Sequence, residues 1–204
     1  MPKLLDLATR RASIRAFSRD PIHLADVIYA IRVAHEAPSG ANRQPWRFLI
    51  VTDDHVKSKI RHVCELAERE FHKIAPSWFK NWLRDKGISW RKPFLTDAPV
   101  LVLIFFKKDE PYASESTWLA IGYLILALEE RGLASLTYTP SRSEDVNEVL
   151  NVPKAYCLAA IIPIGHPLCR KAKEPRTPLK RLCFLNTWGN PLTESEEGEV
   201  ELSG

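Results

Sequence analysis

Two arginines and a serine near the N-terminus have a spacing that suits the binding of an anion. Arg11, Ser13 and Arg15 occupy alternate positions of the stretch Arg11-Ala12-Ser13-Ile14-Arg15. In an extended segment their side chains therefore point to one side. A guanidinium group offers planar donors that match a phosphate, and it stays charged when it is buried. A solvated basic turn is the alternative interpretation of these residues.

A short polar loop with the sequence Ala-Pro-Ser-Gly-Ala-Asn-Arg-Gln-Pro-Trp spans residues 37–46. Its small residues would let a flat ligand approach the backbone closely. An ordinary connection between a helix and a strand is the alternative. The loop is therefore a second candidate for ligand binding.

A carboxylate, an imidazole and an ammonium group form the third candidate. Glu68 and His72 are four residues apart on a predicted helix and share one face. Together with Lys92 they could bind a zwitterion, with Glu68 taking its ammonium and Lys92, helped by His72, its carboxylate. A surface pair of helix neighbours and an unrelated exposed lysine would give the same sequence.

Hydroxyl groups and one further arginine complete the candidates. The stretch Thr137-Tyr138-Thr139-Pro140 closes a predicted strand, where a hydroxyl could donate to a ligand nitrogen. Thr and Tyr also favour strands for reasons unrelated to function. Arg176 follows in a proline-rich stretch and could bind a phosphate or be solvated.

Other kinds of chemistry lack their motifs. No His or Cys has the spacing of a metal site, and no Gly-x-Gly or Gly-x-Ser-x-Gly occurs. The net charge is only +4 and most basic residues are scattered, which disfavours a nucleic-acid partner. No apolar run reaches the roughly 18 residues that span a bilayer, and no leader peptide is evident. We expect a cytoplasmic protein with reduced cysteines, no metal and no membrane contact.

Hydrophobic periodicity predicts the elements that position these residues. The first expected helix covers residues 4–9, and the second starts at residue 24 and is ended by Pro38-Ser39-Gly40. The third is capped by Asp53 or Asp54, and the fourth begins at Ser114 or Ser116 and stops at Gly132. The fifth has a Ser141–Glu144 capping box. Expected strands cover residues 46–51, 99–106, 133–139 and 156–164. The fold class is α+β, with about four strands and five helices in three layers.

Two segments stand apart from this pattern. Between residues 74 and 97 the periodicity breaks down and aromatic residues alternate with Lys and Arg, which suggests a mobile cover. The helix after Ser114 is apolar nearly all round, so it needs cover from the core or from a partner subunit. We expect a single domain over residues 1–190, with an insertion at about 74–97 and a flexible acidic tail at 191–204.

Taken together and in order, these motifs resemble the nitroreductase superfamily from about Leu5 to Leu182. The resemblance rests on Arg11-x-Ser13-Ile14-Arg15-x-Phe17, the loop at 37–46, Gly132-Leu133, Pro163-Ile164-Gly165-His166-Pro167 and Arg176-x-Pro178-Leu179. Within the superfamily the chain is most similar to the iodotyrosine deiodinase branch, through Trp90-Arg91-Lys92-Pro93-Phe94-Leu95, Ala98-Pro99 and Thr137-Tyr138-Thr139-Pro140.

The resemblance implies a nitroreductase-like sheet that is mixed but mainly antiparallel, in a domain-swapped homodimer with FMN at the subunit interface. It assigns FMN binding to Arg11, Ala12, Ser13, Ile14, Arg15, Asn42, Thr137, Tyr138, Thr139 and Arg176, and, from the other subunit, to Pro38, Ser39 and Gly40. Thr139 would be the catalytic hydroxyl at the flavin N5, which favours one-electron steps. The substrate would contact Ala41, Glu68, His72 and Lys92.

Two departures from the family pattern affect these assignments. His72 stands where the deiodinases have a tyrosine, and Ala12 stands where the family often has Arg or His. The implied activity is FMN-dependent reduction of an aromatic acceptor with electrons from NAD(P)H or another donor. Its most specific version is the reductive dehalogenation of a halotyrosine. A general nitroaromatic or quinone reductase and a flavin carrier or sensor without turnover are the alternatives.

Overall fold

The structure is a computed structural model that describes residues 3–169 and 171–191. The chain divides into two compact units, Met1–Ala172 and Lys173–Gly204. All candidate site residues except Arg176 belong to the first unit. The expected single domain over residues 1–190 stays a prediction, and most of the acidic tail lies outside the described residues.

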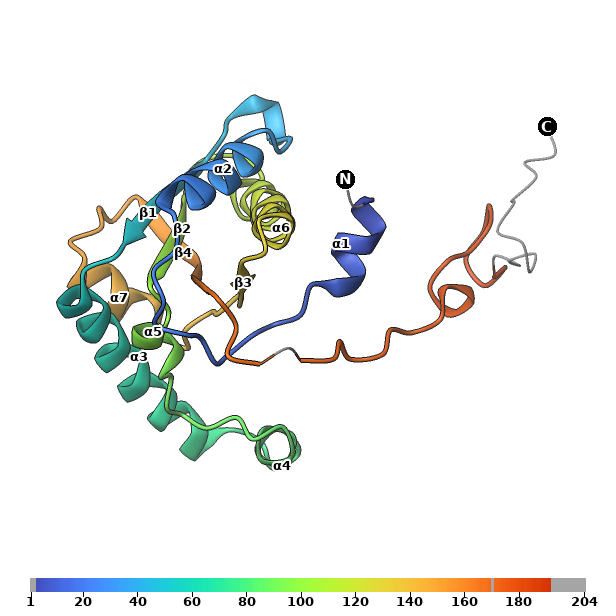
Figure 1. The fold of residues 1–204 in the computed structure, drawn as a ribbon. Helices are drawn as coiled ribbons and strands as arrows, with labels where there is room; N and C mark the ends of the chain where they lie inside the picture. The colour runs from blue at the N-terminus through green and yellow to red at the C-terminus, as the bar shows by residue number, and fades with distance from the viewer. Residues whose placement is uncertain (1–2, 170, 192–204) are drawn as a thin grey trace. The chain divides into compact units, whose positions relative to one another are not determined.

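A four-stranded sheet forms the middle layer of the first unit (Figure 1). Its order is β1 (Trp46–Val51), β2 (Val100–Lys107), β4 (Tyr156–Gly165) and β3 (Ala134–Ser135), and all neighbouring strands are antiparallel. The central strand β2 is a continuous apolar run that is buried on both faces. Among the described residues, parallel pairing is confined to an isolated bridge between Ser13 and Ser135.

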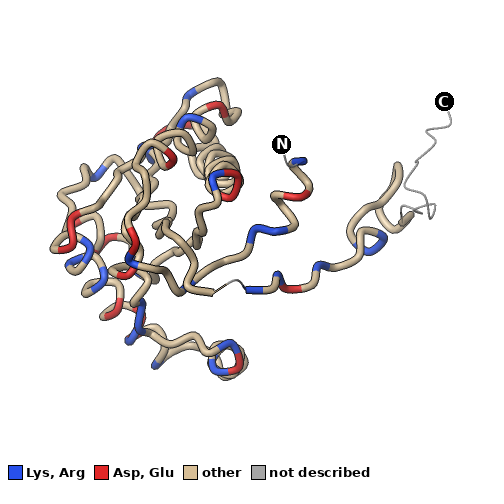
Figure 2. Tube along the Cα trace, viewed as in Figure 1, with Lys and Arg blue, Asp and Glu red and all other residues tan. Residues whose placement is uncertain are grey.

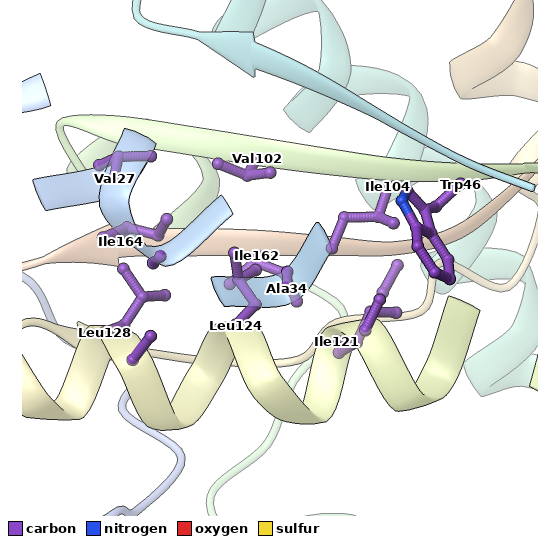
Figure 3. Packing of buried hydrophobic residues seen from close by; sticks show 14 of the residues in the cluster. Val27, Ala34, Trp46, Val102, Ile104, Ile121, Leu124, Leu128, Ile162 and Ile164 are labelled. Atoms are coloured by element: carbon purple, nitrogen blue, oxygen red, sulfur yellow. The ribbon is translucent and has the colours of Figure 1, made fainter. Parts of the chain in front are cut away.

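Two long helices cover one face of the sheet. The helices α2 (Leu24–His35) and α6 (Ala113–Glu130) pack there against side chains of β2 and β4 (Figure 3). Leu124 and Leu128 of α6 meet Ile162 and Ile164 of β4, and none of these four side chains is exposed to solvent. Burial of such side chains contributes about 1.5–3 kcal/mol each, so this layer fixes the orientation of α6.

Three other helices cover the opposite face. They are α3 (Asp54–Ile74), α5 (Phe94–Asp97) and α7 (Ser143–Val149). Ile60 of α3 and Leu95 of α5 are fully buried against Leu101 and Leu103 of β2. Alternate residues of β2 thus pack into two hydrophobic cores, one on each face of the sheet. The three-layer α+β fold expected from the sequence is confirmed. The shorter elements are α1 (Leu4–Arg10), α4 (Ser77–Asp85) and the 3-10 turns Gly40–Asn42 and Leu179–Arg181.

Two of the expected helix boundaries are confirmed by their local geometry. The carboxylate Oδ1 of Asp53 accepts a hydrogen bond from the backbone N–H of Val56 at 2.8 Å, as an N-cap residue does. Gly132 has a φ of +71° directly after the C-cap Arg131, a conformation that favours glycine.

One expected helix start is slightly displaced, and one expected cap is wrong. Helix α6 begins after Tyr112, which has a φ of 52°, and no serine caps it. Helix α7 begins after Arg142 without a side-chain cap, so Ser141 and Glu144 form no capping box. In the second case a tertiary contact has replaced the local one, because the backbone N–H of Ser141 donates to a carboxylate oxygen of Glu68.

Two expected segments differ in extent. The strand expected at 133–139 is reduced to Ala134–Ser135, followed by a single bridge between Tyr138 and Ile161. The irregular stretch at 74–97 contains the helices α4 and α5. Pro76, Gly87 and Pro93 divide this stretch into pieces that are too short for a clear periodicity.

Candidate active site

A buried ion pair between Glu68 and Lys92 is the centre of the candidate site. The Nζ atom of Lys92 lies 3.1 Å from Oε2 of Glu68, and the two side chains are only 6% and 10% exposed. Glu68 lies on α3, and Lys92 lies just before α5. An uncompensated charge at such a depth would be costly, so each of these groups needs a partner of opposite charge.

Neutral groups complete the coordination of this pair. The Tyr138 hydroxyl and the backbone N–H of Ser141 each donate to Oε1 of Glu68 at 3.2 Å. The ammonium group of Lys92 also donates to the carbonyl oxygen of Ser89 at 2.9 Å. Groups from the segment before α5 and from the segment after β3 therefore converge on the Glu68 carboxylate of α3.

His72 lies beside the pair, one helical turn after Glu68. Its Nε2 atom is 3.9 Å from Oε2 of Glu68. Burial lowers the pKa of His72, the charge of Lys92 lowers it further, and Glu68 opposes both effects. The imidazole is therefore mainly neutral near neutral pH, and it adds no second full positive charge to the cluster.

A cavity of about 280 Å³ opens next to Lys92. Its polar lining includes Arg15, Lys92, Thr137 and the backbone of the turn at Gly87. Its apolar lining includes Ile88, Phe94 and Leu136. Apolar walls with a few convergent polar groups are typical of sites for small, partly aromatic ligands.

Tyr138 forms part of the wall and is kept protonated. Burial raises the pKa of Tyr138 far above its ordinary value, and the neighbouring Cys64 and Glu68 raise it further. Burial also raises the pKa of the Cys64 thiol to about 12. Both groups therefore stay neutral at physiological pH, so Tyr138 serves as a hydrogen-bond donor to Glu68.

The arginine segment runs beside the short strand β3. The backbone N–H of Ile14 donates to the carbonyl oxygen of Ser135 at 3.1 Å, and the Ile14 side chain is buried. The flanking residues Arg11, Ala12 and Ser13 are half-buried and Arg15 is exposed at the cavity. Because Ala12 is half-buried like Arg11 and Ser13, the expected placement of Arg11, Ser13 and Arg15 on one side stays a prediction.

The polar loop at 37–44 has a constrained backbone. Ala41, Asn42 and Gln44 have φ values of 48°, 53° and 46°, which non-glycine residues rarely adopt. The backbone N–H of Gly40 donates to the Ser116 hydroxyl of α6 at 3.2 Å. A Cβ atom on Gly40 would lie 2.6 Å from Cδ2 of Tyr112, so a larger residue would have to displace the Tyr112 side chain.

The first unit brings together some of the expected site residues and leaves others apart. Arg15, Thr137, Tyr138 and Lys92 share the cavity, and Glu68 and His72 adjoin it through Lys92. Thr139 is exposed and does not line the cavity. Neither do the loop residues Pro38, Ser39, Gly40, Ala41 and Asn42. Arg176 belongs to the second unit.

Glu65 is a site neighbour that was not expected. Its Oε1 atom accepts a hydrogen bond from the backbone N–H of Lys92 at 2.7 Å and pairs with Nε of Arg61 at 2.7 Å. The spacing of Arg61 and Glu65 on one helix was a visible signal of a pair. The contact with Lys92 depends on the tertiary fold and left no signal in the sequence.

The first unit has the fold of a known family, and its sequence matches the model of the Nitroreductase family over residues 8–166; the chain belongs to this family. It is 49% identical to an iodotyrosine deiodinase of Thermotoga neapolitana, over 86% of this chain and 95% of that protein. It is 34% identical to an iodotyrosine deiodinase of Haliscomenobacter hydrossis, over 77% and 76% of the two chains. The resemblance inferred from the motifs is confirmed.

Solved structures agree with this assignment. Oxidized iodotyrosine deiodinase bound to FMN and 3-iodo-L-tyrosine superposes with a TM-score of 0.84 and 48% identity, over 86% of this chain and 96% of that one. A BluB-like flavoprotein from Clostridium difficile superposes with a TM-score of 0.77 at 23% identity, which shows a shared fold alone.

Three further features of the structure concern membranes, metal ions and cysteines. Among residues 3–169 and 171–191, no helix is long and apolar enough to cross a bilayer. The same part of the chain contains no group of three or more His, Cys, Asp or Glu side chains that could hold a metal ion. The four cysteines, Cys64, Cys157, Cys169 and Cys183, are free thiols.

Proposed function

We propose that this protein is an FMN-dependent oxidoreductase that removes halogen reductively from a halotyrosine zwitterion. Membership of the nitroreductase family and the two related iodotyrosine deiodinases support the proposal. The net reaction replaces the carbon–halogen bond by a carbon–hydrogen bond, with consumption of two electrons and one proton and release of halide. NAD(P)H is the proposed source of the electrons.

The buried Glu68–Lys92 pair beside the cavity is the observation that carries the proposal. An amino acid zwitterion carries an ammonium group that can pair with Glu68 and a carboxylate that can pair with Lys92. It can therefore replace the ion pair and leave each buried charge with a partner. A ligand with a single charge would leave either Glu68 or Lys92 uncompensated. The site therefore favours amino acids over phenols, amines or acids of the same size. His72 and Ala41 are the remaining proposed substrate contacts.

The residues around the cavity have the chemistry to hold FMN. Arg15 lines the cavity, and Arg11 and Ser13 of the same segment offer a further cationic and a hydroxyl donor. Phe94 and Leu136 give the cavity apolar walls for a flat ring. Bound FMN would supply the two electrons of the reaction. The proposed cofactor contacts are Arg11, Ala12, Ser13, Ile14, Arg15, Asn42, Thr137, Tyr138, Thr139 and Arg176, with Pro38, Ser39 and Gly40 from a second copy.

Two proposed roles concern atoms close to the reaction. Thr139 would donate a hydrogen bond from its hydroxyl to the cofactor, and the residue is exposed in the structure. An arginine at the cavity, Arg15, would stabilise the negative charge of the reduced cofactor. The helix α4 and its aromatic side chains would exclude water from the bound substrate.

A homodimer is part of the proposal. Helix α6 presents an apolar face in the first unit, on which Trp118, Leu119 and Tyr123 are 41%, 50% and 41% exposed. A cluster of exposed large apolar residues marks a surface for association. A second copy would cover this face, and its loop at 37–44 would then complete the cofactor site.

Replacement of the central carboxylate tests the proposal. We expect Glu68→Gln to weaken 3-iodo-L-tyrosine binding by more than about 1 kcal/mol, the scale of a hydrogen bond to a charged group. Occupancy by FMN should not change, because Glu68 faces Lys92 rather than the arginine segment. Titration of flavin fluorescence would measure both quantities.

Equal affinity of the two proteins for iodotyrosine would remove the pair from substrate recognition. A general nitroaromatic or quinone reductase would then be the better account of the fold. A protein that takes up no FMN would contradict the proposed cofactor.

A further inference from the structure

Four polar side chains form a stripe along α3 that follows the segment from Lys92 to Pro99. Lys57, Arg61, Glu65 and Glu68 are spaced by four, four and three residues, so they lie on one face of the helix. Charges of both signs occur along α3 (Figure 2). Each of the four side chains contacts the segment 92–99, and we refer to this set of contacts as the α3 seam.

Helix α3 and the segment 92–99 run antiparallel along the seam, so later residues of α3 contact earlier residues of the segment. The ammonium group of Lys57 donates to the carbonyl oxygens of Ala98 and Pro99 at 3.1 and 3.4 Å. One turn later, a guanidinium nitrogen of Arg61 donates to the Thr96 hydroxyl at 2.8 Å. The seam therefore fixes which residue of the segment lies opposite each turn of α3.

Lys92 is held at the end of the seam by two carboxylates. Oε1 of Glu65 accepts a hydrogen bond from its backbone N–H at 2.7 Å, and Oε2 of Glu68 lies 3.1 Å from its ammonium group. The first contact holds the main chain and the second holds the side chain. Bonds from an N–H group to a carboxylate are short and strong, as the distance of 2.7 Å indicates.

These two contacts would respond differently to a ligand. A zwitterion that displaces the Glu68–Lys92 pair changes the partner of the Lys92 ammonium group. The backbone contact with Glu65 uses a different atom and is compatible with either partner. Glu65 itself is oriented by Nε of Arg61 at 2.7 Å, and its side chain is 19% exposed.

We propose that Glu65 is a positioning residue for substrate binding, which keeps Lys92 in place when its ammonium group exchanges Glu68 for the ligand's carboxylate. This inference rests on the proposed function. Lys57 holds Ala98 and Pro99, and Arg61 bonds Thr96 through a guanidinium nitrogen other than the Nε atom that pairs with Glu65. Loss of Glu65 should therefore displace Lys92 without release of α5.

Ligand titration of the FMN-loaded protein tests this role. We expect Glu65→Ala to raise the dissociation constant of 3-iodo-L-tyrosine about tenfold, the effect of one lost hydrogen bond to a charged group. Glu65→Gln retains an oxygen acceptor and should restore affinity to within about threefold of wild type. In turnover the change should appear in KM rather than in kcat.

Glu70→Ala is the matched control, because Glu70 lies on the same helix but is 61% exposed and pairs only with Lys73 in the described contacts. It should bind FMN and iodotyrosine as wild type does. If Glu65→Ala does not fold, Glu65→Asp takes its place, since the shorter side chain withdraws the acceptor from Lys92 and should give the same loss.

The outcomes separate this inference from the proposed function. Wild-type affinity in a folded Glu65→Ala or Glu65→Asp protein would overturn the role of Glu65 and leave the proposed function intact. An equal loss in Glu65→Ala and Glu65→Gln would overturn it as well, because the retained acceptor should rescue binding. Failure of wild type to bind iodotyrosine would overturn the proposed function and the substrate role of Glu65 together.

Discussion

At the scale of single residues, the charge state of the cluster around Glu68 decides what it can bind. Glu68 and Lys92 compensate each other, and Tyr138 stays protonated because burial raises its pKa. His72 is mainly neutral because burial, and then the charge of Lys92, lower its pKa. The cluster is therefore close to neutral overall and suits a ligand that is itself neutral overall.

Protonation of His72 should disturb this balance. Below its ordinary pKa of 6.5 the imidazole gains charge progressively, and a charged His72 competes with the ligand's ammonium group for Glu68. We expect the dissociation constant of 3-iodo-L-tyrosine to rise as the pH falls below 6.5. Fluorescence titrations at several pH values, with wild type and His72→Gln, would measure this.

The substitution supplies the control for that experiment, because Gln cannot titrate. The same pH dependence in His72→Gln would assign the effect to another group. The sign for stability follows from the lowered pKa: the unfolded chain binds this proton more readily, so protonation of His72 lowers the free energy of unfolding as the pH falls.

At the scale of elements, α6 has two faces with different partners. Leu124 and Leu128 are fully buried against the sheet, while Trp118, Leu119 and Tyr123 remain partly exposed. A helix that is apolar nearly all round cannot bury its whole surface against one sheet. The exposed face of α6 is therefore the surface on which the proposed dimer depends.

A charge on that face should separate the subunits. We expect Leu119→Glu to weaken dimerisation by about 2 kcal/mol or more, because a buried charge would lack a partner in the interface. Sedimentation velocity would measure the association state. Leu66→Glu on α3, which alters a residue of the same type that is 47% exposed, should leave the dimer intact. Equal association of Leu119→Glu and wild type would exclude this face as the interface.

Elements with a strong local pattern could be predicted from the sequence. The strand Trp46–Val51 has the expected bounds, and β2 is recognisable because it is apolar without interruption. The capping box expected at Ser141 was wrong because a tertiary contact takes the Ser141 backbone N–H, and Ser116 lies inside its helix, where its hydroxyl has a tertiary partner. The Ser116 hydroxyl accepts from Gly40, and the N–H of Ser141 donates to Glu68. Local sequence does not contain these partners.

The candidate site shows the same limit. The convergence of Glu68, His72 and Lys92 was expected, first from residue type and then from the family resemblance. Glu65 was not expected as part of the site, because its partner is the backbone N–H of Lys92, a residue 27 positions later. A backbone partner leaves no mark on residue type, so only the fold could reveal it.

At the scale of the whole molecule, the three layers explain why the site lies where it does. The α3 layer carries Glu68 and holds the segment that contains Lys92, and the segment after β3 supplies Thr137 and Tyr138. The α6 layer carries Ser116, which holds the loop at 37–44. One layer thus forms the substrate side of the proposed site, and the other forms the surface and loop through which a second copy would complete it.

Single-turnover chemistry tests the central claim most directly. The protein would be loaded with FMN, reduced with dithionite without oxygen, and mixed with 3-iodo-L-tyrosine, and tyrosine and iodide would be quantified. The account predicts one tyrosine and one iodide for each reduced flavin, with reoxidation of the flavin. Reduced flavin that persists beside unchanged iodotyrosine, but is reoxidised by a nitroaromatic compound or a quinone, would contradict it.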